Sequence, residues 1–252
     1  LRPTEGNVYI KGVSIRENPV EAKRHIGFLP QTPPLHPDLT VTEYLEYCAG
    51  LRHVPDSEIS TAVKAVMGKC GISHFNKRLI RNLSGGYQQR VGIAQAIIHN
   101  PEFVVLDEPT NGLDPNQIVE IRHLIKEIAE DRTVVLSTHI LSEVQATCDY
   151  IRMIEQGNLV FAGTVDEFDN YIIPNTLVVT LVAAPPVEEL RSIPGVSGVE
   201  ELGGMKYRLQ YTDFQEVTER LVETSVTRGW RLTEVYQEKS SLDAVFAELS
   251  KK

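Results

Sequence analysis

Between Val8 and about Gly163, short β-branched apolar runs alternate with longer amphipathic segments. This alternation is typical of strands separated by helices. It predicts strands at residues 26–29, 103–106 and 133–137. The last two runs are almost continuously apolar, which favours a parallel sheet covered on both faces.

A helix is predicted between the second and third of these strands. Asp114 is its predicted N-cap and Pro115 its first residue, a position where proline is well tolerated. One face of this helix carries four isoleucines at helical spacing, Ile118, Ile121, Ile125 and Ile128. The chain therefore contains a strand, loop, helix and strand unit.

A second region follows a predicted hairpin, in which two apolar runs flank Gln156-Gly157-Asn158. Residues 168–175 have the composition of a linker. Beyond it the predicted order is strand 177–182, helix 187–191, strand 196–202, strand 206–211, helix 214–227, strand 231–236 and helix 242–249. A βαββαβ order with an extra terminal helix is typical of a small ferredoxin-like domain. We expect two domains, residues 1–168 and 175–252.

Composition narrows the classes of function. The chain has 252 residues, 42% hydrophobic content and a net charge of -9, so it shows no basic surface for nucleic acid or an anionic membrane. Cys48, Cys70 and Cys148 lie far apart without a pairing motif, which argues against disulfides and a zinc site and favours a reducing cytosol. The longest charge-free stretch, residues 170–187, contains three prolines and is not a membrane span.

Candidate chemistry begins at "FVVLDEPTNGLDP", where Asp107 and Glu108 follow an apolar strand. Two such acids are more often solvated loop residues. At the carboxyl edge of a parallel sheet, however, they enter the crevice where α/β proteins bind ligands. There Asp107 can hold Mg²⁺, and Glu108, facing the other way on the strand, can reach a water molecule.

A second candidate element is "NLSGGYQQRVGIAQAIIHNP". Ser84, Gly85 and Gly86 precede a predicted helix, so exposed backbone N–H groups and the helix dipole favour a phosphate there. Taken alone, the same residues are an ordinary serine N-cap after a glycine turn.

Together these segments resemble the ATP-binding domains of ABC transporters. "LSGGYQQR", "FVVLDEPTNGLDP" and "TVVLSTHILSE" look like the signature motif, the Walker B strand with its D-loop, and the switch-histidine segment, while "IGFLPQTPPLHPDLTVTEYLEY" matches the Q-loop region. "SSLDAVFAELS" and the βαββαβ region look like the C-terminal extension of multidrug, sodium-efflux and gliding-motility type exporters. The resemblance implies a P-loop NTPase-like α/β domain with a helical signature subdomain, followed by a small α+β ferredoxin-like domain.

The resemblance also implies roles for individual residues, with ATP and Mg²⁺ as cofactors. Glu108 would polarise the hydrolytic water and His139 would contact the γ-phosphate. Asp107 and Gln31 would support the Mg²⁺ ion. Asp114 would cross a dimer interface. The signature would meet ATP held on another subunit through Ser84, Gly85, Gly86 and Gln88.

Two features depart from the family pattern. Tyr87 stands where many members have glutamine, which puts ribose or phosphate contacts from that position in doubt. The Walker A pattern G-x-x-x-x-G-K-S/T does not occur in residues 1–252, and Gly68-Lys69-Cys70, with Val63 in place of the first glycine, is predicted to be a helix end. In the family the P-loop precedes a stretch like "LRPTEGNVYIKG", so we expect an N-terminally truncated sequence whose product binds nucleotide poorly and is inactive alone.

The leading hypothesis is an ATP-hydrolysing subunit of an ABC exporter, cytoplasmic and peripheral at the inner face of the cell membrane. Its expected partners are a transmembrane permease, through which alone it contacts the membrane, and a second ATP-binding subunit, as a homodimer. The alternative is a regulatory module without a P-loop that pairs with an intact ATPase. A third reading, an ATPase acting on nucleic acid or ribosomes, is disfavoured by the acidic charge. The C-terminal domain is expected either to contact its twin or to cap the first domain.

Overall fold

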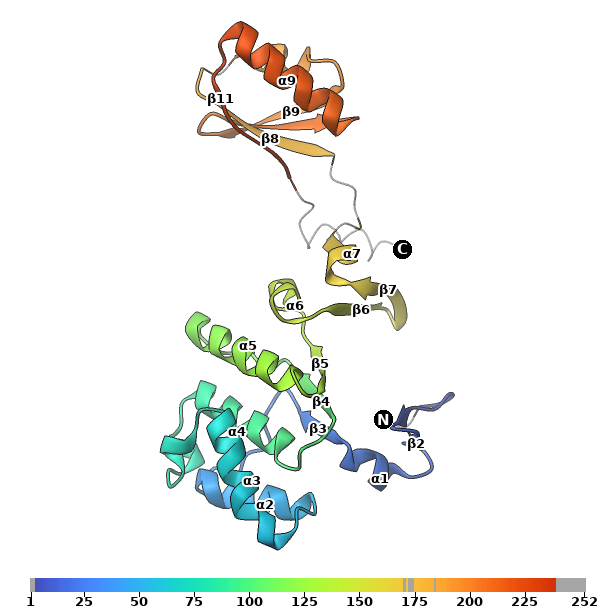
Figure 1. Cartoon of the computed structure of the whole chain (residues 1–252), viewed down its shortest axis with the longest axis vertical. Coiled ribbons are helices and arrows are strands. Elements are labelled where there is room, and N and C mark those ends of the chain that lie inside the picture. Colours follow the sequence, from blue (N-terminus) through green and yellow to red (C-terminus); the bar gives the residue numbers. More distant parts are fainter. Residues whose placement is uncertain (1–2, 170, 172–174, 184, 239–252) are drawn as a thin grey trace. The chain divides into compact units, whose positions relative to one another are not determined.

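A computed structural model describes residues 3–169, 171, 175–183 and 185–238 (Figure 1). The chain divides into two compact units, Leu1–Cys148 and Asp149–Lys252. This division lies earlier than the predicted domain boundary at residues 168–175. A division into compact units does not by itself define domains, so the two domains at residues 1–168 and 175–252 stay a prediction.

The first unit contains short strands, a parallel sheet and several helices. Its elements are β1 (Tyr9–Ile10), β2 (Val13–Ser14), α1 (Pro19–Arg24), β3 (Ile26–Leu29), α2 (Val41–Leu51), α3 (Asp56–Lys69), two 3₁₀ turns (Ser73–Phe75 and Ile80–Asn82), α4 (Gly85–Ile97), β4 (Phe103–Asp107), α5 (Pro115–Ala129), β5 (Thr133–Ser137) and α6 (Leu141–Thr147). The predicted strands at 26–29 and 133–137 are confirmed, and β4 extends one residue beyond its prediction.

The parallel sheet has the order β3-β4-β5. Leu29 pairs with Leu106 and Asp107 pairs with Ser137, so the carboxyl ends of all three strands lie at one edge. This edge is where open parallel sheets collect their functional side chains.

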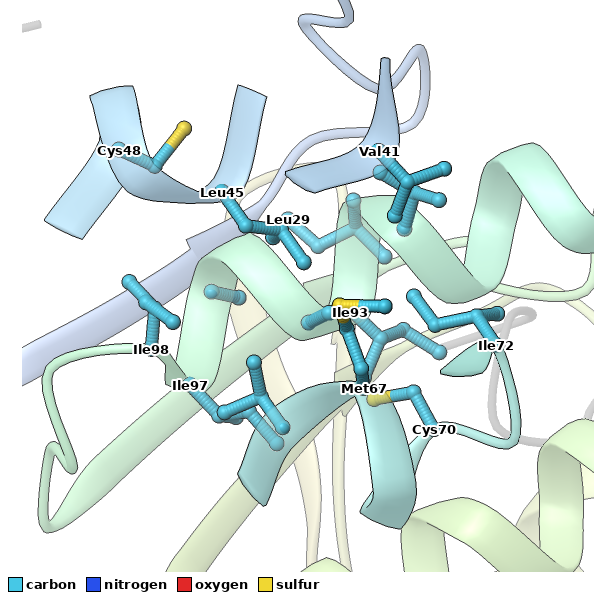
Figure 2. Packing of buried hydrophobic residues seen from close by; sticks show 14 of the residues in the cluster. Leu29, Val41, Leu45, Cys48, Met67, Cys70, Ile72, Ile93, Ile97 and Ile98 are labelled. Atoms are coloured by element: carbon cyan, nitrogen blue, oxygen red, sulfur yellow. The ribbon is translucent and has the colours of Figure 1, made fainter. Parts of the chain in front are cut away.

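One face of this sheet carries the main core. Leu29, Val104 and Leu106 are fully buried and belong to one apolar cluster with residues of α2, α3, α4 and α5. Figure 2 shows part of this cluster, with labelled residues from β3, α2, α3 and α4. Helix α4 lies close against β3, where Gln95 Nε2 donates to the Phe28 carbonyl at 2.9 Å. Helix α4 and strand β3, which leads to Gln31, are thus joined by a direct hydrogen bond.

The other face of the sheet remains partly open. Phe28 is 44% exposed and Val135 is 43% exposed, and Thr133 and Ser137 of β5 are exposed as well. The prediction that β5 is covered on both faces is therefore wrong for the part of the chain that the structure describes, because the side chains on this side meet solvent.

Helix α5 forms as the sequence predicts. Asp114 is its N-cap, Pro115 is its first residue, and Ile121, Ile125 and Ile128 are buried. Ile118, nearer the N-terminus, is only half-buried.

The second unit begins with a hairpin and ends in a four-stranded sheet. Its described elements are β6 (Tyr150–Glu155), β7 (Asn158–Thr164), α7 (Val165–Asp169), β8 (Thr176–Leu181), α8 (Val187–Arg191), β9 (Val196–Gly203), β10 (Lys206–Tyr211), α9 (Phe214–Arg228) and β11 (Leu232–Gln237). Gln156 and Gly157 turn the hairpin with positive φ angles of 49° and 82°, as its two-residue turn requires.

The sheet of the second unit has the order β11-β8-β10-β9, with antiparallel neighbours throughout. Helix α9 packs on it, and Leu177, Leu209, Val217 and Trp230 share its buried core (Figure 1). The predicted βαββαβ fold is confirmed, while the predicted helix 242–249 lies outside the described residues. None of the helices that the structure describes has the length and hydropathy needed to cross a membrane.

Candidate functional site

Asp107 and Glu108 lie at the carboxyl edge of the sheet, both half-buried. Strand β4 ends at Asp107, and Glu108 adopts a positive φ of 46°. Strand alternation therefore does not extend to Glu108, because the backbone leaves the strand at that residue, and the prediction that Glu108 faces away from Asp107 stays a prediction. A left-handed conformation costs a glutamate roughly 1–3 kcal/mol, and such residues are found in turns and at functional sites.

Glu108 is held by the segment after β5. Its backbone N–H donates to the Ser137 carbonyl at 2.8 Å. Its Oε1 accepts from the His139 backbone N–H at 3.1 Å and lies 2.7 Å from His139 Nδ1. The structure thus brings these two predicted residues into direct contact, through both the ring and the backbone of the histidine.

The contact with Glu108 changes the pKa of the His139 ring. Hydrogen bonding to Glu108 and its negative charge raise the pKa of His139, with a smaller contribution from Glu143. The His139 side chain is 75% exposed and that of Glu108 is 14% exposed. The arrangement therefore favours an exposed imidazolium whose Nδ1 is occupied by a largely buried carboxylate.

A second layer of polar residues supports this pair, and sequence reasoning did not find it. Thr138 Oγ1 lies 3.4 Å from Glu108 Oε2 and 3.2 Å from Glu143 Oε2. Glu143 also accepts from the Thr110 hydroxyl. In sequence, Glu143 is an acid in the first turn of a helix, the usual place for a solvated acid, so no signal marked it as buried.

The signature segment forms the start of α4. Ser84 is the N-cap, as predicted, but its side chain accepts no capping hydrogen bond. A Cβ added at Gly85 would meet no atom within 4 Å, whereas one at Gly86 would lie 2.7 Å from Gln117 Cδ. Gly85 therefore leaves the helix start open to a ligand, while Gly86 permits close packing against α5.

Gln88 and Tyr87 have structural partners within the first unit. Gln88 Nε2 lies 3.3 Å from the Ile80 carbonyl and 3.2 Å from that of Leu83, so it fixes the loop before the signature. Tyr87 packs edge-on against Phe75 with ring centroids 4.5 Å apart. An aromatic contact thus accounts for tyrosine at this position.

Asp114 lies at the start of α5, whereas Gln31 lies in the loop after β3. The Asp114 carboxylate accepts from the N–H groups of Asn116 and Gln117 at 3.0 Å, so its observed function is capping α5. Gln31 is exposed and follows β3 by two residues, at the same sheet edge as Asp107. Among the described residues, no hydrogen bond joins Gln31 to Asp107 or the signature residues to Glu108.

Two observations concern metal and phosphate. The described residues contain no group of three or more His, Cys, Asp or Glu side chains arranged to hold a metal ion. Gly68-Lys69-Cys70 is a helix end, as predicted, with Lys69 as the last residue of α3. Burial raises the pKa of the Cys70 thiol to about 12, and Cys70 belongs to the core, whereas Gly68 is exposed and Lys69 is half-buried.

Comparison with known proteins gives matches to ABC transporter proteins. A family described as ABC transporter matches residues 1–111. The bacitracin transport ATP-binding protein BcrA of Bacillus licheniformis is 38% identical over 64% of this chain and 52% of its own length. The ABC transporter ATP-binding protein NatA of Bacillus subtilis (strain 168) is 32% identical over 71% of this chain and 76% of its own length. The chain thus spans about half the length of relatives such as BcrA.

A solved structure shows the same fold. The structure of cbiO1 from Clostridium perfringens, part of the ABC transporter complex cbiONQ, aligns with a TM-score of 0.61 at 28% identity. The alignment covers 66% of this chain and 69% of cbiO1.

Proposed function

This chain belongs to the family of ABC transporter ATP-binding proteins, and we propose from that premise that it is the ATP-binding and ATP-hydrolysing subunit of an exporter. The observation that carries the proposal is the hydrogen-bonded pair of Glu108 and His139 at the sheet edge, next to Asp107. Export as the direction of transport rests on the resemblance of the C-terminal region to that of exporter ATPases.

Glu108 is proposed to orient the attacking water. Its Oε1 is occupied by His139, while Oε2 has only a long contact of 3.4 Å with the Thr138 hydroxyl. Oε2 thus has the capacity to accept a hydrogen bond from water. Orienting and polarising that water is the main task left to the protein in phosphoryl transfer.

His139 is proposed to contact the γ-phosphate. Its Nδ1 is bound to Glu108, and its pKa is raised, which favours the ring form in which Nε2 also carries a proton. An exposed N–H donor with positive charge is suited to a phosphate oxygen.

The remaining residues fit ATP and Mg²⁺. Mg²⁺ is usually held by one or two protein oxygens together with phosphates and water, and Asp107 and Gln31 offer such oxygens at one edge. Bound Mg²⁺ neutralises charge on the phosphates of ATP. The open backbone at Ser84 and Gly85 fits a phosphate at the start of α4.

The partners are proposed from the same residues. Since no hydrogen bond joins the signature start to Glu108 or His139 among the described residues, we propose that Ser84, Gly85 and Gly86 serve ATP held on a second copy of the chain. A transmembrane permease would receive the resulting motion, with this subunit peripheral at the cytoplasmic face of the membrane. The domains 1–168 and 175–252, and Asp114 at the dimer interface, are part of this proposal.

Residues 1–252 alone are proposed to bind Mg-ATP weakly and to be inactive, because they contain no G-x-x-x-x-G-K-S/T motif to surround the β- and γ-phosphates. Titration with a fluorescent ATP analogue tests this point. Micromolar affinity of this chain would contradict it.

Steady-state phosphate release by the full-length protein, assembled with its permease, tests the function. Glu108→Gln removes the negative charge that polarises the water and one of the two acceptor oxygens, and it is expected to lower kcat by about 10² or more while ATP binding persists. Glu130→Gln, a change at an exposed glutamate of the same unit, is the matched control and should retain normal turnover. Near-normal hydrolysis by Glu108→Gln would refute the assigned role.

A further inference from the structure

Glu143, on the short helix α6, is a buried acid outside the motifs that define the site. Its side chain is only 1% exposed. A carboxylate is seldom buried to this extent unless polar partners satisfy it, because removing its charge from water is costly. The identity of its partners therefore indicates what Glu143 does.

The two oxygens of Glu143 join two loops. Oε1 accepts from the hydroxyl of Thr110, in the loop after β4. Oε2 lies 3.2 Å from the hydroxyl of Thr138, in the loop after β5. The guanidinium of Arg122, on α5, lies 3.9 Å from Oε1 and supplies the nearest positive charge.

Both loops carry residues of the site. Thr110 is two residues beyond Glu108, and Thr138 directly precedes His139. Thr138 Oγ1 also lies 3.4 Å from Glu108 Oε2 and accepts from the Ile140 N–H at 3.1 Å. A single carboxylate thus fixes the ends of the two segments whose approach creates the contact between Glu108 and His139.

We propose that Glu143 is a positioning residue that holds the Thr138–His139 segment against Glu108 by bridging the hydroxyls of Thr110 and Thr138. Its effect on turnover rests on the proposed ATPase function, whereas its effect on the position of His139 does not. A buried ion pair that served stability alone would have no reason to contact both loops of the site, and apolar packing would serve as well.

The direct test is the NMR signal of the His139 ring in the wild-type protein, Glu143→Gln and Glu108→Gln. The chain has seven histidines, and a His139→Gln variant identifies the signal. Glutamine keeps the size of Glu143 but removes its charge and one of its acceptor oxygens, so one of the two threonine hydroxyls loses the atom to which it donates. We expect the His139 signal and its pKa in Glu143→Gln to move toward those of Glu108→Gln, with Glu130→Gln unchanged.

A second variant separates positioning from folding. Thr110→Val removes a hydroxyl that donates to Glu143 and makes no hydrogen bond to Glu108 or His139 among the described residues, so it can reach His139 only through the bridge. We expect a shift of the His139 signal in the same direction as in Glu143→Gln, but smaller. Far-UV circular dichroism confirms that each variant is folded. If Glu143→Gln does not fold, Thr110→Val alone decides the proposal.

Activity provides the second readout. In the full-length protein, Glu143→Gln is expected to lower kcat by about 10- to 100-fold with little change in KM, because small misplacement of a catalytic group has costs of this size. An unchanged His139 signal in folded Glu143→Gln and Thr110→Val, while Glu108→Gln moves it, would overturn the proposal. A wild-type full-length protein without ATPase activity would instead refute the proposed function and leave the NMR result to decide the role of Glu143.

Discussion

Gly27 sets the distance between β3 and α4, and Gly27→Ala is the sharpest test of the packing that places Gln31 at the sheet edge. A Cβ at this position would lie 2.2 Å from the Ala96 carbonyl oxygen and 3.0 Å from Pro101 Cγ. The oxygen belongs to the backbone of α4 and cannot rotate away. Strand and helix would have to separate by more than about 1 Å to reach an ordinary contact of about 3.5 Å.

The cost follows from that separation. Forced overpacking of a core costs about 1–3 kcal/mol. The 2.9 Å hydrogen bond from Gln95 to the Phe28 carbonyl would be stretched beyond bonding distance, which adds about 1 kcal/mol. We therefore expect Gly27→Ala to reduce the free energy of unfolding by about 3 kcal/mol.

Urea unfolding followed by far-UV circular dichroism measures this effect. With a slope of about 2 kcal/mol per molar urea, the midpoint should fall by about 1.5 M. Gly68→Ala is the matched control, because a Cβ there meets no atom within 4 Å and alanine favours the helix by about 0.5–1 kcal/mol. Equal midpoints for wild type and Gly27→Ala, or a shift of the same sign in both variants, would refute the reasoning.

Three further predictions concern ionisable and capping groups. Glu108→Gln should lower the pKa of His139, measured by NMR titration. Because Glu108 raises that pKa in the folded state, the pair stabilises the folded protein below pH 6.5, and this stabilisation is lost as the pH rises through the raised pKa. Burial lowers the pKa of His99 from 6.5 to about 4 in the folded state, so as the pH falls the unfolded chain binds a proton at His99 before the folded protein does. The contribution of neutral His99 to the free energy of unfolding is therefore complete above pH 6.5 and should be lost as the pH falls toward 4. His99→Gln should flatten the dependence of the urea midpoint on pH in that window, and an unchanged slope would contradict the assignment. Thr40→Ala removes the capping box with Glu43 and should cost about 1 kcal/mol in urea unfolding, whereas no loss would show that the cap contributes little.

Much of the fold follows from local sequence patterns. The apolar runs that became β3, β4 and β5 are bounded by polar or turn residues, and Asp114-Pro115 starts α5 through contacts within a few residues. The turn at Gln156-Gly157 is local in the same sense. Such features depend on near neighbours, so a single sequence is sufficient to predict them.

The geometry of the candidate site depends on contacts between distant segments. The motifs identified Glu108 and His139, but their hydrogen bond requires the loops after β4 and β5 to meet. The burial of Glu143 requires the same approach, and nothing near it in sequence indicates the Thr110 contact. The positive φ of Glu108 likewise follows from the end of the strand and not from its residue type.

The central claim is that Glu108 activates the water that hydrolyses ATP. Its most direct test is a single-turnover measurement, in which the full-length protein and its Glu108→Gln variant are incubated with radiolabelled Mg-ATP and the nucleotide retained on each protein is identified. We predict ADP on the wild-type protein and intact ATP on Glu108→Gln. ADP formation at a similar rate by both proteins would contradict the account.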